Sequence, residues 1–184
     1  MTESIASLIR ERRTIHQFKD SPTPGDDLIQ SAIDHAIWAP NHHLSQPWHF
    51  YLPGQDTIAR ICTLNAQIVA EKKGEKAAKL KHRRWLSMPG WLVLTVDRSE
   101  DVIRQQEDYA ACCCVAQNLA LYLWNVGVGL KWTTGAVTRD ERFFDILDVD
   151  FGAEEVVGLF WYGYPQDIPA AVRKESATFI KRLP

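Results

Sequence analysis

An interior β-strand is predicted by the run VVGLFWYGYP, residues 156–165, because apolar side chains fill both alternating sets of positions. Two further short runs rich in β-forming residues, WHFYLP at 48–53 and WLVLTVD at 91–97, can form other strands. The chain is therefore expected to build a small sheet in which residues 156–165 occupy an inner position.

Helical patterns precede these runs. Ile5, Leu8 and Ile9 have the spacing of an amphipathic helix, which leads into the sequence RERRTIHQF. A second helix is predicted with Thr23 as its N-cap and Pro24 in its first position. Asp26 and Asp27 suit the positive start of this helix, and Pro40 is expected to end it.

Two more helices are predicted downstream. A long one covers residues 107–126, and a short one follows a capping box formed by Thr138 and Glu141. The apolar part of the long helix contains Gln117 and Asn118, which favours a buried helix of a soluble protein over a membrane span. Helices and strands alternate irregularly, with more helix than strand. This pattern favours an α+β or mixed α/β architecture, and we expect an α+β fold with a small mixed or antiparallel sheet flanked by helices.

Composition limits the number of domains and the kinds of partner. The 184 residues are 46% hydrophobic and contain no Pro-, Gly- or Ser-rich divider, so a single domain over 1–184 is expected. A net charge of -2 gives no basic footprint for nucleic acid or for an anionic membrane. The basic stretch KKGEKAAKLKHRR, 72–84, is interpreted as an exposed charged helix, with a surface for a phosphorylated ligand as the alternative.

The cysteines predict a reduced, cytoplasmic protein. Cys112, Cys113 and Cys114 are consecutive, which is not metal-ligand spacing, and they are interpreted as small core residues. The start of the chain shows no secretory signal pattern, which fits reduced thiols in the cytoplasm.

The stretch APNHHLSQPWHF, residues 39–50, raises the question of a metal site. A zinc site would use His42, His43 and His49, with His35 as a further candidate. Adjacent histidines in a loop rarely point at one ion, and no cysteine or carboxylate has a companion spacing. The chain also has no Gly-x-Ser-x-Gly elbow, Walker loop or Gly-x-Gly-x-x-Gly after a strand. The histidine spacing therefore disfavours a zinc site. The missing motifs disfavour a serine hydrolase and a P-loop or Rossmann nucleotide-binding site.

The arginines near the N-terminus allow two interpretations. Arg10, Arg12 and Arg13 can complement the negative end of the first helix. Alternatively, Arg12 and Arg13 form a phosphate clamp, to which Thr14 adds a hydroxyl donor.

A family resemblance favours the second interpretation. RRTIHQF, the later AP and QPWHF, the segment EDYAACCCVAQNLALYLWNVGVGLKWTTGAV and the strand VVGLFWYGYP occur in an order that resembles the FMN-dependent nitroreductase family. The resemblance covers most of the chain. It is strongest for short members whose loop reads A-P-D-H-K. It implies a nitroreductase-like fold and an interlocked homodimer with two FMN molecules at the subunit interface.

The resemblance also implies which residues bind FMN. The phosphate and ribityl contacts would come from Arg12, Arg13 and Thr14 near the N-terminus and from Arg173, beside Lys174, near the C-terminus. His42 and, less directly, Gln46 would contact the flavin, and the segment beside the isoalloxazine ring would be Trp132, Thr133 and Thr134. Without the resemblance, Trp132 could be ordinary core and the threonines an ordinary strand end. The chain departs from many members at Leu44, where they have Asn, and at His16, where they have Arg.

The activity implied by this resemblance is an FMN-dependent NAD(P)H oxidoreductase. It would work by ping-pong hydride transfer through flavin N5, with nitroaromatic or quinone-like acceptors, no obligatory catalytic side chain and no metal. The choice between NADH and NADPH stays open. Three alternatives also stay open: a non-catalytic flavin carrier or sensor, relatives of this fold that cleave flavin or remove halogens, and a dimeric scaffold that has lost FMN. No nucleic-acid or membrane partner is expected.

Overall fold

A four-stranded antiparallel sheet forms the centre of the computed structural model, which describes residues 4–184. The strands are ordered β1 (Trp48–Tyr51), β2 (Gly90–Asp97), β4 (Glu154–Gly163) and β3 (Gly129–Thr133). β4 pairs with β2 on one side and with β3 on the other, so the predicted interior strand is confirmed.

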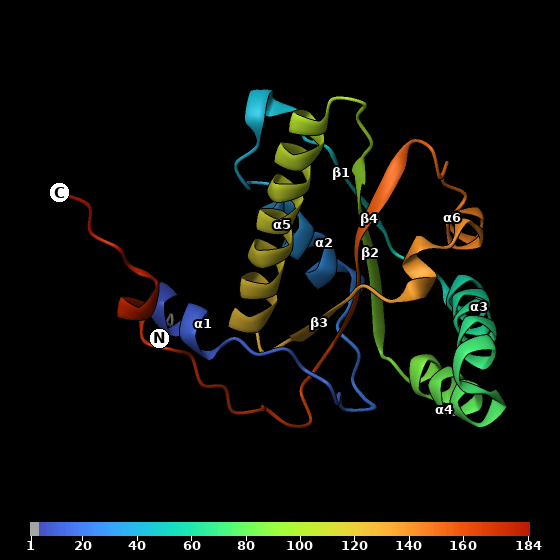
Figure 1. Cartoon of the computed structure of the whole chain (residues 1–184). Helices are drawn as coiled ribbons and strands as arrows, with labels where there is room; N and C mark the ends of the chain where they lie inside the picture. The colour runs from blue at the N-terminus through green and yellow to red at the C-terminus, as the bar shows by residue number, and fades with distance from the viewer. Residues whose placement is uncertain (1–3) are drawn as a thin grey trace.

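Helices cover both faces of this sheet, as Figure 1 shows. On one face lie α2 (Asp26–Ala36) and α5 (Val102–Asn125), and on the other lie α3 (Gln55–Lys73), α4 (Glu75–Leu86) and α6 (Glu141–Leu147). Successive residues of a strand point to opposite faces, so Phe160 belongs to the core with α2 and α5, whereas Trp161 belongs to the core with α3 and α4. Burial on both faces explains why the central part of β4, residues 156–162, has no charged side chain. The expected α+β class is confirmed.

Two predicted helix starts are wrong. α2 begins at Asp26 with Gly25 as its N-cap, so neither Thr23 nor Pro24 has the predicted role. The start coincides with the two carboxylates of Asp26 and Asp27, which suit the positive end of a helix. The long helix α5 begins at Val102, earlier than predicted, because the Asp101 carboxylate accepts hydrogen bonds from the first turn.

The capping box predicted for the last helix is also wrong. Asp140 caps α6 by accepting the backbone N–H of Arg142. Thr138 instead donates its hydroxyl to Gly135 O within the 3-10 turn η2 (Ala136–Arg139). The carboxylate of Asp140, two residues closer to the helix, therefore has the capping role that was predicted for Thr138.

The basic stretch 72–84 is not one continuous helix, because it spans the turn between α3 and α4. α3 ends at Lys73 and α4 begins at Glu75, and Gly74 between them has a φ of 79°. That left-handed conformation is accessible to glycine at little cost, which explains the break at this position.

The three consecutive cysteines differ in exposure. Cys112 is buried, Cys113 is half-buried and Cys114 is exposed, all as free thiols. The expectation of core residues is therefore correct for Cys112 and wrong for Cys114. Within residues 4–184, none of the helices combines the length and the apolar character needed to cross a bilayer.

Both ends of the described chain are exposed. α1 (Ile5–Glu11) has no fully buried residue: its Ile5 and Ile9 are exposed and its Leu8 is half-buried, so the described residues 4–184 cover only part of the predicted apolar face. The C-terminal segment with η3 (Ser176–Phe179) leaves the sheet after β4 and extends to the same side of the molecule as α1 (Figure 1).

Candidate functional site

The arginine segment near the N-terminus lies beside β3. Thr14 forms a parallel bridge with Leu130, and the Ile15 N–H donates to Leu130 O at 3.1 Å. The same strand continues into Trp132 and Thr133. Two motifs that are far apart in the sequence are thereby placed along one sheet edge.

Arg12 is the centre of a group of like charges at this edge. Burial lowers the pKa of Arg12, and the neighbouring positive charges of Arg13 and Arg173 lower it further. Arg173 therefore reaches this edge from the C-terminal segment. No carboxylate among residues 4–184 forms an ion pair with any of these three arginines. Clustered guanidinium groups without a carboxylate are suited to binding an anion.

Arg13 also supports the other interpretation of this segment. Its guanidinium donates to the backbone oxygens of Arg10 at 2.5 Å and Arg12 at 3.0 Å. It thus binds the carbonyl end of α1, as expected of a cation at a helix C-terminus. Arg13 caps the helix, whereas the side chain of Arg12 is not used in this way.

Trp132 lies across β4 with one edge open to solvent. Its indole N–H donates to Val157 O at 2.9 Å, its ring centroid is 5.4 Å from that of Phe160, and the residue is 39% exposed. Gly158 makes this position possible, because a Cβ there would lie 2.2 Å from the indole nitrogen. Thr133 is half-buried and Thr134 is exposed, so hydroxyl groups follow the indole along the edge.

The loop 41–46 has an unusual backbone. His43, Leu44 and Gln46 all have positive φ, between 46° and 54°, although none of them is glycine. Such residues cost on the order of 1–3 kcal/mol each and persist when surrounding contacts enforce them. Strain of this kind is typical of functional sites.

Polar contacts with the start of α5 hold this loop in place. His42 Nδ1 is 2.6 Å from Glu107 Oε2, and the Ser45 hydroxyl donates to the buried Asp108 at 2.6 Å. The Gln46 backbone N–H donates to the side-chain oxygen of Asn41 at 3.0 Å. A polar cavity of about 450 Å³ lies between the loop and α5.

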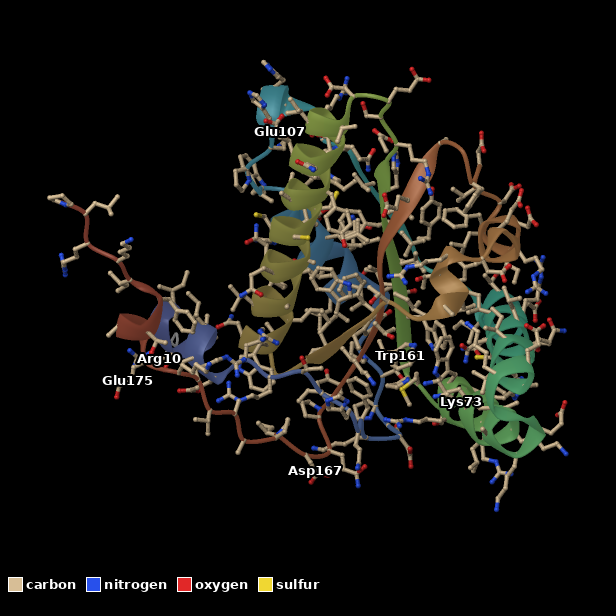
Figure 2. All side chains as sticks on the ribbon, viewed as in Figure 1. Arg10, Lys73, Glu107, Trp161, Asp167 and Glu175 are labelled. Atoms are coloured by element: carbon tan, nitrogen blue, oxygen red, sulfur yellow. The ribbon has the colours of Figure 1, made fainter. Side chains whose placement is uncertain are left out.

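Two groups of predicted site residues lie near opposite ends of α5. His42 contacts Glu107 near the start of that helix, whereas Leu130, beside Thr14, follows its end. Figure 2 shows Glu107 at the upper end of α5 and Arg10 beyond the lower end. The helix between Glu107 and Asn125 spans about 27 Å at the usual rise per residue. Arg12, Arg13, Thr14 and Arg173 form one group, and His42 with Gln46 form the other. Trp132, Thr133 and Thr134 lie between the two groups, because β3 runs back along α5 and Thr134 lines a cavity together with Tyr109 of that helix.

The histidines do not form a metal site. His49 Nε2 lies 2.7 Å from Asp97, and His35 bonds to Ser31 O and stacks on Tyr122. His42 and His43 stack on each other. Among residues 4–184, no group of three or more histidine, cysteine or acidic side chains is arranged to hold a metal ion.

A second group of cations lies on the other face of β3, and the sequence motifs did not indicate it. Lys131 Nζ is 5.0 Å from the ring centroid of Trp161, and the pKa of Lys131 is lowered by burial and by Arg84 and Lys81. Burial, Lys131 and Arg84 also lower the pKa of His16. His16 and Arg84 line a shared cavity of about 370 Å³. The sequence feature that could have indicated this group is the basic stretch 72–84, which ends at Arg84.

Known proteins resemble this chain over most of its length. The Bacillus subtilis (strain 168) protein named "Putative NAD(P)H nitroreductase YfhC" is 27% identical over 176 residues, 92% of this chain and 89% of that protein. The crystal structure of a nitroreductase-like family protein from Bacillus cereus superposes with a TM-score of 0.88 at 28% identity, covering 100% of this chain and 97% of the other.

A more distant structure shares the fold. A nitroreductase with bound FMN from Desulfitobacterium hafniense DCB-2 gives a TM-score of 0.75 at 17% identity, and the match covers both chains fully. The model of the Nitroreductase family matches residues 9–164, which include the arginine segment, the strained loop and all four strands. The chain therefore belongs to the nitroreductase family.

Proposed function

We propose that this protein is an FMN-dependent oxidoreductase that works as a homodimer and takes electrons from NADH or NADPH. The observation that carries the proposal is the group Arg12, Arg13 and Arg173, without a paired carboxylate among residues 4–184, beside the half-open indole of Trp132. FMN has the matching pair of features, a dianionic phosphate at one end and a flat aromatic ring at the other.

The phosphate end of FMN fits the arginine group. Guanidinium groups can hold phosphate oxygens with two parallel hydrogen bonds, and the exposed hydroxyl of Thr14 is available for a further contact. Burial and, after it, the repulsion from Arg13 and Arg173 lower the pKa of Arg12, and a bound anion would offset both effects. We therefore assign the phosphate to Arg12, Arg173 and Thr14, with Arg13 contributing charge while it caps α1.

The ring end of FMN fits the edge of β3. Trp132 is fixed by its hydrogen bond to Val157 O, so its exposed edge offers a rigid apolar surface. Thr133 and Thr134 can donate and accept hydrogen bonds at the rim of a bound ring. When bound, FMN would supply the redox chemistry, by accepting a hydride and passing electrons to an acceptor. The protein binds and orients the reactants.

The separation of the two groups of site residues supports a homodimer. His42 and Gln46 lie too far from the arginine group for one small cofactor to touch both within one chain. A second copy related by twofold symmetry can place its strained loop over this chain's β3 edge. The exposed apolar side chains of α1 and of the C-terminal segment are available to that copy, among them Ile5, Ile9, Phe179, Ile180 and Leu183.

The electron donor and the acceptor are assigned by chemistry. The second cationic group, which contains His16, Lys131 and Arg84, lies on the other face of β3 from Trp132, and its positive charges suit the phosphates of a dinucleotide. We assign flat, electron-poor nitroaromatic or quinone-like molecules as acceptors, because such molecules can stack on an open face of the bound flavin ring. No side chain among the assigned contacts has to transfer a proton.

An anaerobic absorbance spectrum tests the function. We expect the purified protein to bind FMN and to show the visible absorbance band of the flavin. We expect added NADPH or NADH to bleach this band within seconds. A yellow protein that neither nucleotide bleaches would support a flavin carrier or sensor. A colourless protein that FMN cannot reconstitute would contradict the proposal and favour a scaffold that has lost the cofactor.

A further inference from the structure

The pairing of His42 with Glu107 determines what the imidazole can offer a ligand. Nδ1 of His42 lies 2.6 Å from Glu107 Oε2. An ionised carboxylate can only accept a hydrogen bond, so the proton must be on Nδ1. In the neutral imidazole this leaves Nε2 without a proton, as a hydrogen-bond acceptor.

Two contacts orient the imidazole, the bond to Glu107 and the stacking of His43, and further bonds hold the loop around it. His43 stacks on it with ring centroids 4.0 Å apart. Arg104, Glu107 and Asp108 are spaced as neighbours on one face of α5, and Arg104 and Ser45 both bind Asp108. The backbone strain at His43 and Leu44 is maintained by these contacts. A loop held this firmly presents Nε2 in one direction.

We propose that Glu107 is a positioning residue that holds His42 as the Nδ1–H tautomer, so that Nε2 accepts a hydrogen bond from the N3–H of the flavin bound to the partner subunit. This inference rests on the proposed function. The oxidised isoalloxazine ring has one ring N–H, at N3, whereas N1, O2, O4 and N5 all accept. An acceptor imidazole therefore matches N3 alone, and the opposite tautomer would match the carbonyl oxygens instead.

The tautomer itself can be measured without enzyme turnover. The experiment uses the full chain, labelled with nitrogen-15 in its histidines, in long-range imidazole NMR spectra with and without FMN. We expect His42 to show a protonated Nδ1 and a bare Nε2 before FMN is added, and we expect FMN to shift the Nε2 signal. A predominantly Nε2–H form of His42, or a signal that FMN leaves unchanged, would overturn the inference.

Variants separate positioning from general structure. Glu107→Ala should mix the two tautomers and weaken FMN binding roughly three- to tenfold, as expected for the loss of one hydrogen bond. Glu107→Gln keeps an amide oxygen that can accept the Nδ1 proton, so it should recover most of the affinity. The matched control is Asp97→Ala, because Asp97 binds His49 at 2.7 Å on a similarly exposed surface. Equal FMN affinities for Glu107→Ala and Asp97→Ala would overturn the inference.

A modified cofactor tests the partner atom. N3-methyl-FMN lacks the donor, so it should bind the natural protein about tenfold more weakly than FMN, and this difference should largely disappear in His42→Ala. An equal penalty in His42→Ala would show that N3 has another partner and would overturn the assignment. Absence of FMN binding by the natural protein would overturn the proposed function and this inference together, whereas the outcomes above overturn the inference alone.

Discussion

Thr14 is paired with Leu130 in a parallel bridge at the outer edge of β3. This contact places the arginine segment against the strand that contains Trp132, and Arg173 joins it from the C-terminal segment. The assembly thus combines a cationic end and an aromatic end along one edge. The predictions below test its parts separately.

Arg12→Ala should weaken FMN binding by about 1.5–3 kcal/mol, because it removes a charged hydrogen bond to the phosphate. The dissociation constant can be measured from the quenching of flavin fluorescence. Arg60→Ala, an exposed arginine on α3 outside the assigned contacts, is the control and should leave the affinity unchanged. The same affinity for both variants would remove Arg12 from the phosphate site.

Gly158→Ala should displace the indole of Trp132. The added Cβ would lie 2.2 Å from the indole nitrogen and 2.8 Å from Phe160, and the hydrogen bond to Val157 O would be lost. Overpacking of this kind costs about 1–3 kcal/mol of unfolding free energy. Urea titration measures that loss, and a weaker FMN affinity should accompany it. Gly54→Ala is the control, because nothing lies within 4 Å of its added Cβ. Equal stabilities would show that the indole is free to move.

Alkaline pH should destabilise the fold through its buried thiols. Burial raises the pKa of Cys62 to about 12, and burial with the neighbouring Cys113 and Asp108 raises that of Cys112 to about 12. Thiols with the ordinary pKa of 9.0 ionise in the unfolded chain first. This contribution is therefore fully present below pH 9 and is lost as the pH rises from there toward 12.

The measurement is the free energy of unfolding from urea titrations at several pH values. Cys112→Ala should flatten the alkaline decline, because one group with a raised pKa is gone, whatever its effect on stability at neutral pH. Cys114→Ala removes an exposed thiol and should leave the slope as it is. A slope unchanged in Cys112→Ala would mean that this thiol ionises equally in both states.

The sequence predicted the strands better than the helix ends. β4 could be recognised because its burial on both faces leaves a local apolar pattern. Helix caps could not be recognised as well, because Thr138 and Asp140 both suit an N-cap and the choice depends on local geometry. Within the candidate site, the resemblance indicated Arg12 and His42. It did not indicate Glu107 or Lys131, because their roles come from contacts between distant segments.

Arg84→Glu should raise the KM for NADPH more than the KM for NADH. Arg84 belongs to the second cationic group with Lys131 and His16, and NADPH carries one more phosphate than NADH. Loss of a charge-assisted contact and the new repulsion should produce a change of about tenfold for NADPH. Arg83→Glu makes the same charge change on the same helix, facing the groove between α3 and α4. If both variants raise the KM for NADPH equally, the effect comes from the general positive charge of the helix and not from a phosphate site at Arg84.

Ile9→Asp should weaken the homodimer and, with it, FMN binding. Ile9 is 55% exposed on α1, a helix without a buried residue, so the charge should leave the fold of one chain intact. In the dimer the same charge would be buried without a partner, which is costly. Light scattering during gel filtration measures the mass, and flavin fluorescence measures the affinity. Leu80→Asp, at 60% exposure on α4, is the matched control. A monomeric Ile9→Asp variant that binds FMN as tightly as the natural protein would show that one chain forms the complete site, and the assignment of His42 to the partner's flavin would then be wrong.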